Sequence, residues 1–252
     1  GATAEVTSVP GKNWYFQTGL EFYFDKVNSD KSEQEDGQIT DVRGYYPDGA
    51  TSTSYALYST HTFNFQPFSL VAGTRLNMYQ IKAEDDIFGD VDVSPVALVG
   101  SLSAIYHASG HVNLIASVYN AFRAPNLNDL SSFGTFNSGI EVPNPDLDPE
   151  RSINTEIGVK VRIEKFSGSF FFYFYQLTDL IERVEATWQG QDSIEGEKVY
   201  KKENFAKAYI RGFEAGAEYE FIPGLSALGN VTYTYGQNES QDEPMRRIPP
   251  LF

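Results

Sequence analysis

The sequence contains no cysteine, only three histidines, and far fewer basic than acidic residues. Without cysteine, disulfides, thiolate metal sites and cysteine nucleophiles are excluded. The 19 lysines and arginines against 34 acidic residues give a net charge of −15. This balance argues against nucleic acid as a partner, because phosphate binding needs basic patches. Neither a Gly-x-Ser-x-Gly elbow nor a phosphate-binding loop occurs, so we expect no enzymatic activity and no cofactor.

Long apolar runs are also missing. The densest aromatic stretch, residues 170–175, is far shorter than the roughly 18–20 apolar residues that a membrane helix needs. Yet aromatic residues make up 15% of the chain, with 19 Phe and 16 Tyr. A membrane helix is therefore excluded, and the aromatic residues need another place in the fold.

Apolar and polar residues alternate over long stretches. Between residues 152 and 164, Ile153, Ile157 and Val159 share one side, whereas Glu156 and Lys160 share the other. A period of two is that of a β-strand with one apolar and one polar face. Similar alternation predicts nine or ten strands, at residues 3–9, 14–25, 54–65, 70–82, 96–107, 112–122, 152–164, 167–182, 207–221 and 226–237.

The predicted strands are longer than those of ordinary soluble sheets, and nine to eleven residues suffice to cross a bilayer obliquely. Their connections alternate strictly in length. Short turns are expected at 10–12, 66–69, 109–111, 165–167 and 223–225. Long loops are expected at 27–53, 83–95, 123–151, 183–199 and 238–250. Short turns on one side and long loops on the other are typical of transmembrane barrels.

Two folds explain the alternation. In a soluble sandwich the apolar face packs on a second sheet, whereas in a membrane barrel it meets lipid. Strand length, one-sided long loops and aromatic residues near strand ends, such as Tyr209, Tyr219 and Phe221, favour the barrel. We predict an all-β, transmembrane, antiparallel up-and-down β-barrel in which every backbone group is paired.

Four segments carry a family resemblance. They are Asn-Ala-Phe-Arg-Ala-Pro-Asn-Leu-Asn-Asp-Leu at 120–130, Asn-Pro-Asp-Leu-Asp-Pro-Glu-Arg-Ser at 144–152, Glu-Asn-Phe-Ala-Lys-Ala-Tyr-Ile-Arg-Gly-Phe-Glu at 203–214, and Pro-Met-Arg-Arg-Ile-Pro-Pro-Leu-Phe at 244–252. In this order and spacing they resemble the barrel of TonB-dependent receptors. Gly212 lies inside one of these predicted strands, where a missing side chain admits a close neighbour, either a plug or another barrel strand.

The resemblance implies a 22-stranded outer-membrane barrel filled by a plug domain, of which residues 1–252 form a partial β-barrel domain without the plug. It implies ligand uptake driven through the TonB complex in a Gram-negative bacterium. The implied partners are outer-membrane lipid, the plug of the same protein and a small ligand, a ferric siderophore or other iron complex. A glycan, heme or cobalamin receptor, a passive porin and a non-spanning adhesive protein are the alternatives.

Ligand-binding candidates lie where strands enter the long loops. Arginines there can hold an anionic ligand by paired hydrogen bonds, and tyrosines can stack on it. Lipopolysaccharide contact or salt bridges between loops would explain the same arginines. The candidates are Arg123, Asn126, Asn128, Tyr45, Tyr46, Arg246 and Arg247.

Metal binding has weaker signals. Acidic residues crowd the loop at 83–95, where flexible carboxylates suit calcium, although their spacing matches no helix-flanked calcium motif. The calcium candidates are Asp85, Asp86, Asp90 and Asp92, and a solvated acidic loop is the alternative. His107 and His111 flank a predicted turn, where we expect solvated side chains rather than a metal site.

Overall fold

In the computed structural model, residues 1–245 and 248 are described. Ten long strands form the body of the fold. They are β1 (Ala2–Gly11), β2 (Trp14–Lys26), β5 (Thr51–Phe65), β6 (Phe68–Ala83), β8 (Val96–His107), β9 (Val112–Arg123), β12 (Glu150–Ile163), β13 (Phe166–Glu185), β15 (Glu197–Ile222) and β16 (Leu225–Asn238).

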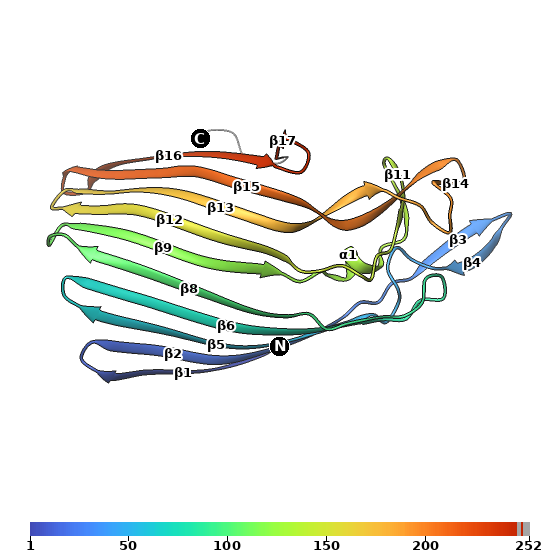
Figure 1. The fold of residues 1–252 in the computed structure, drawn as a ribbon, viewed down its shortest axis with the longest axis horizontal. Coiled ribbons are helices and arrows are strands. Elements are labelled where there is room, and N and C mark those ends of the chain that lie inside the picture. Colours follow the sequence, from blue (N-terminus) through green and yellow to red (C-terminus); the bar gives the residue numbers. More distant parts are fainter. Residues whose placement is uncertain (246–247, 249–252) are drawn as a thin grey trace.

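Each long strand pairs antiparallel with the next, in the order in which they are named above, as Figure 1 shows. The turns between them gather at one end, and the long connections form a cap at the other (Figure 1). The cap contains β3 (Lys31–Glu35), β4 (Gln38–Val42), β7 (Val91–Val93), α1 (Leu127–Ser131), β10 (Gly134–Phe136), β11 (Gly139–Val142) and β14 (Ser193–Ile194). The short β17 (Glu243–Pro244) pairs with the end of β16. The prediction of an all-β, up-and-down antiparallel fold with nine or ten strands is confirmed.

Helix contributes little to this fold. α1 spans five residues, and within the described part of the chain no helix is long and apolar enough to cross a bilayer. The sheet remains open between β1 and β16, for which no pairing occurs among the described residues.

The two faces of the sheet are buried in the reverse of the usual sense. On the apolar face Leu98 is 68% exposed and Ile157 is 56% exposed. On the opposite, polar face Asn77 and Asn154 are buried, each 5% exposed. A soluble sandwich would bury the leucine and expose the asparagine. This pattern indicates that the apolar face contacts an apolar medium and that the polar face makes hydrogen bonds within the barrel.

Aromatic side chains mark two levels of the apolar face. Near the turns, Phe65, Phe68 and Tyr106 align across three strands. Toward the cap, the rings of Phe22 and Tyr55 lie 5.2 Å apart. From Phe65 to Tyr55 the chain rises about 33 Å along β5, or about 25 Å in height at a tilt of about 40°. This height equals the apolar band of a membrane barrel.

Glycines on the polar face lie beneath aromatic rings. A Cβ on Gly212 would meet both the carbonyl oxygen of Tyr233 and the hydroxyl of Tyr173. Tyr173 is the cross-strand partner of Gly212, and its hydroxyl lies 2.6 Å from Thr234 Oγ1. The close neighbour expected at Gly212 is therefore another barrel strand, and the tyrosine covers the gap left by the glycine.

The prediction of a long loop at residues 183–199 is wrong. β13 runs on to Glu185 and β15 begins at Glu197, so these two strands pair well beyond the apolar band. Alternation of apolar and polar residues does not reveal this extension. Where the strands extend beyond the apolar medium, both faces of the sheet carry polar residues. The loop at 27–53 likewise contains the β3–β4 hairpin, and the loop at 123–151 contains α1, β10 and β11.

Candidate functional site

The cap has a hydrophobic core of its own. Ala50, Ile81, Val91, Leu130 and Leu147 are buried and pack together, with Phe88 and Leu127 against them. These residues come from three different connections and from the cap end of β6. Because burial of large side chains stabilises by about 1.5–3 kcal/mol each, the loops form one packed layer rather than separate flexible segments.

Arg43 ties three of these connections together. Its Nε donates to Asp85 Oδ2 at 2.5 Å, and Nη2 donates to the carbonyl of Ser131 at 3.0 Å. Nη1 donates to Gly44 and Tyr45 carbonyls at 2.7 and 3.2 Å. A guanidinium with five donors in a planar fork suits such a junction. Arg43 therefore fixes the 43–50 segment beside α1.

A second junction surrounds Glu141 on β11, which has no exposed surface. Its carboxylate accepts hydrogen bonds from Ser132 and Arg183, and Lys202 Nζ lies 3.1 Å from Oε1. β11 runs parallel to the start of β15, with Ile140 opposite Val199. A buried carboxylate needs several such donors, and here they come from β13, β15 and the end of α1.

Arg123 holds α1 in place. Its Nη1 lies 2.6 Å from Asp129 Oδ2, and its Nε lies 2.6 Å from Glu150 Oε2. Asn126 is the N-cap of α1, and its Oδ1 accepts from Asp129 N at 3.0 Å. The arginine that we expected to bind a ligand is thus engaged by two carboxylates. The alternatives to ligand binding were lipopolysaccharide contact and salt bridges, and the geometry of Arg123 agrees with the salt bridges.

Tyr45, Tyr46 and Asn128 come together beside α1. The two tyrosine rings lie edge to face at 5.1 Å, and Tyr46 Oη donates to Asn128 Oδ1 at 3.3 Å. Burial and the nearby Glu141 raise the pKa of Tyr45 above its ordinary value, so this phenol is neutral at physiological pH. Asn128 is exposed and Tyr46 half-buried. The three side chains form an aromatic and amide surface on the cap.

The calcium candidates are not gathered into a site. Asp85 pairs with Arg43, and Asp92 lies 3.4 Å from Lys82 Nζ. His107 is not merely solvated, because its Nδ1 and Nε2 lie 2.6 and 2.9 Å from Asn113 and Ser69. Within residues 1–245 and 248, no three His, Asp or Glu side chains are arranged to hold a metal ion. Arg246 and Arg247 lie outside the described residues.

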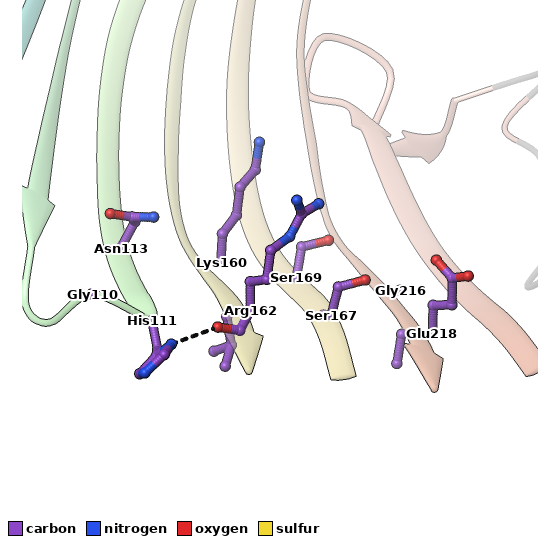
Figure 2. Close-up of a pocket in the computed structure, with 12 residues that line it drawn as sticks. Gly110, His111, Asn113, Lys160, Arg162, Ser167, Ser169, Gly216 and Glu218 are labelled. Atoms are coloured by element: carbon purple, nitrogen blue, oxygen red, sulfur yellow. Dashed lines mark hydrogen bonds between the residues drawn. The ribbon is translucent and has the colours of Figure 1, made fainter. Parts of the chain in front are cut away.

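The polar face adds an inner wall below the cap. Tyr119 and Tyr175 both donate to Glu156 Oε1, at 2.9 and 2.6 Å. Nearer the turns, Lys160, Arg162 and Glu218 line a cavity of about 560 Å³ that opens on the same face. In Figure 2 the Lys160 and Arg162 side chains extend along this wall, and the His111 ring contacts the Arg162 carbonyl. The wall thus carries hydrogen-bonding groups from the cap to the turns.

A cap above a polar inner wall and an apolar outer face is the arrangement of a membrane β-barrel, and comparison with known proteins gives its family. Residues 2–252 match the model of the TonB dependent receptor-like β-barrel. The chain belongs to the TonB-dependent receptor family, and the matched model is that of the family's β-barrel.

Individual relatives are distant. The ferric enterobactin receptor of Pseudomonas aeruginosa is 23% identical over 98% of this chain and 33% of its own length. The structure of the copper transporter OprC matches 98% of this chain and 39% of its own, with a TM-score of 0.78 and 19% identity. The siderophore receptor PirA from P. aeruginosa matches 96% of this chain and 42% of its own, with a TM-score of 0.72 and 19% identity. The chain thus spans about a third of the curated relative, and these relatives are named as receptors and transporters rather than enzymes.

Sequence reasoning missed the residues that build the cap. Arg43, Glu141, Arg183 and Lys202 are separated by long stretches of chain, and only the fold brings them together. The capping box of α1 was visible as Asn126 followed by Asp129 three positions later, a spacing that marks helix starts. This signal would have assigned Asn126 to the helix cap rather than to a ligand.

Proposed function

We propose that the full-length protein is an outer-membrane receptor of a Gram-negative bacterium that takes up a scarce ligand in a TonB-dependent manner. Residues 1–252 form a partial barrel domain, and the plug belongs to the rest of the same protein. The ligand class is a ferric siderophore or another iron complex. Family membership supports the active mechanism over a passive porin.

The reversed burial of the two faces is the observation that carries this proposal. Leucine and isoleucine are exposed on one face, while asparagine and the Tyr119–Glu156–Tyr175 cluster lie on the other. Lipid outside and a hydrogen-bonding lumen inside account for both. The packed cap then lies at the entrance of that lumen, on the side of the long loops.

The ion pairs of the cap indicate how it would bind a ligand. Asp85 neutralises Arg43, two carboxylates engage Arg123, and Glu141 holds Arg183 and Lys202. The described cap therefore offers a ligand stacking and amide hydrogen bonds more than free cations. Tyr46 and Asn128 are the groups that we assign to first contact with the ligand. Such a surface suits a large ligand whose metal charge is already covered by its own donor atoms.

The test is uptake of radiolabelled iron, supplied as a panel of ferric siderophores, by iron-limited cells with and without the full-length gene. We expect deletion to abolish uptake of one complex and a protonophore to do the same in the parent strain. Uptake that is unaffected by the protonophore would point to a passive channel. Unchanged uptake of all iron complexes would contradict the iron assignment and lead to heme, cobalamin and glycan probes.

A further inference from the structure

The wall of the sheet splits between β8 and β9. Their pairing runs from His107 opposite Asn113 up to Ser101 opposite Tyr119, and the register ends there within the described residues. Both strands nevertheless extend further toward the cap. β8 does so between Ser101 and Val96, where it stays paired with β6, and β9 does so between Tyr119 and Arg123, where it stays paired with β12. On the cap side of Ser101 the two strands therefore separate.

Asn120 bridges the split with its side chain. Its Oδ1 accepts from the backbone N of Gly100 at 2.7 Å, and its Nδ2 donates to the carbonyl of Leu98 at 3.5 Å. The amide thereby replaces the ladder bonds that a neighbouring strand would supply. In a medium without water, unpaired backbone groups cost several kcal/mol each, so this replacement keeps the split tolerable.

Cavities lie on both faces of the split. One of about 550 Å³ is lined by Val96, Leu98, Phe122, Arg151 and Ile153. A second of about 320 Å³ is lined by polar-face residues such as Tyr58 and Arg75. Both reach Val99 and Asn120. The outer cavity is thus a groove in the barrel wall, and Asn120 separates it from the inner face.

The groove opens at the level of the outer aromatic residues. Strand register places Val96 in one row with Phe22, Tyr55 and Met78. Val96 is 59% exposed, and Ile153, which also lines the groove, is 57% exposed. Aromatic rows of this kind lie at the boundary between acyl chains and headgroups. The groove therefore faces the upper part of the acyl region.

Two basic side chains lie at the cap side of the groove. Arg151, which lines it, is opposite Thr178 on β13. The exposed Lys207 lies on the far side of β13, next to Ala208, which pairs with Leu177 at the edge of a register shift. Within the described part of the chain, neither Arg151 nor Lys207 forms a salt bridge. In a chain of net charge −15, a pair of outward cations above an apolar groove complements an anionic amphiphile.

We propose that this groove is a binding site for one phosphorylated lipid of the surrounding membrane. An acyl chain occupies the groove between β8 and β9 against Leu98 and Ile153, and the phosphate is bound by Arg151 with Lys207 beside it. This proposal rests on the membrane location proposed above. It adds a lipid site in the wall that is separate from the ligand surface of the cap.

The experiment is native mass spectrometry of the purified full-length receptor with phosphatidylglycerol or phosphatidylcholine of identical acyl chains. We expect one phosphatidylglycerol to be retained at lower lipid concentration than phosphatidylcholine. Arg151→Gln should weaken phosphatidylglycerol retention about fivefold, because one cation near the phosphate is lost, and leave phosphatidylcholine unchanged. Leu98→Trp, which fills the groove, should reduce retention of both lipids.

Matched controls use outward residues away from the groove. Leu114→Trp on β9 and Lys26→Gln on β2 should leave retention of both lipids unchanged. Equal retention by the parent, Arg151→Gln and Leu98→Trp proteins would overturn the proposal, as would equal effects of the controls. Iron uptake measured with the same variants separates the two proposals. A receptor that transports iron but retains no preferred lipid refutes only the lipid site.

Discussion

Lys202 on β15 reaches the fully buried Glu141 on β11, with 3.1 Å between Nζ and Oε1. The two residues belong to strands that run parallel and are separated by a long stretch of chain. Since Arg183 and Ser132 bind the same carboxylate, this contact joins β11, β13, β15 and the end of α1. The cap is thereby a single structural unit.

Glu141→Ala should loosen the cap without unfolding the barrel. Removing one partner of a buried ion pair leaves the other charges uncompensated, at a cost of about 3 kcal/mol. Hydrogen exchange of β11 and of the amides around Val199 should then accelerate about 100-fold. As a control, Glu185→Ala removes a carboxylate from an exposed pair with Lys198 and should change exchange little. Equal effects of the two substitutions would contradict this account of the cap.

Gly212→Ala should destabilise the barrel wall. An added Cβ would meet the backbone oxygen of Tyr233, which cannot move without disturbing the β15–β16 ladder. Overpacking of this kind costs about 1–3 kcal/mol, measurable by urea unfolding in detergent. Gly229→Ala on the adjacent strand is the matched control, because a Cβ there has no neighbour within 4 Å. If Gly229→Ala were the more damaging substitution, the packing of Tyr173 over Gly212 would not be the cause.

Leu102→Arg should be far more harmful than Ser101→Arg. The two positions are neighbours on β8, but Leu102 is on the apolar face, 50% exposed, and Ser101 is on the polar face. A charge facing lipid near the bilayer midplane costs about 2–4 kcal/mol. The yield of folded receptor in the membrane should fall for Leu102→Arg alone. Similar yields for both variants would contradict the assignment of the faces.

Asn128→Ala and Tyr46→Phe should weaken binding of the ferric complex that the uptake assay identifies. Each removes a hydrogen-bonding group from the cap surface, worth about 0.5–1.5 kcal/mol, or about two- to tenfold in Kd. Cap folding should persist, because Asn128 is exposed and Phe keeps the ring that packs on Tyr45. Tyr23→Phe on β2 serves as the control. Unaltered Kd in both cap variants would place ligand contact elsewhere.

The sequence predicts the barrel wall better than the cap, and the reason is physical. Along β12 an apolar medium on one face and hydrogen bonds on the other impose a period of two, so Ile157 and Lys160 reveal their faces directly. Beyond the apolar band no such constraint acts. Residues 197–206 carry charges on both faces and form the start of β15, where they pair with β11, β13 and β14.

The candidate site was predicted only in part. Tyr45, Tyr46 and Asn128 come together in the cap, a contact that their positions in two separate loops do not reveal, and their binding of a ligand stays a prediction. Arg123 is not a free cation, because the β9–β12 register places Glu150 opposite it. Glu150 is far from Arg123 in the sequence, so the sequence does not reveal this ion pair. Which charges in long loops neutralise one another depends on tertiary packing, and no local motif encodes it.

The orientation of the sheet between lipid and lumen is the central claim, and spin labelling along β12 tests it most directly. The sequence has no cysteine to remove, so single cysteines carry a nitroxide at successive positions from Ile153 to Lys160 in the reconstituted full-length receptor. We predict that collision with oxygen, which concentrates in lipid, is high at 153, 155, 157 and 159 and low at the even positions between them. Equal accessibility at neighbouring positions, or high accessibility at the even positions, would contradict the claim.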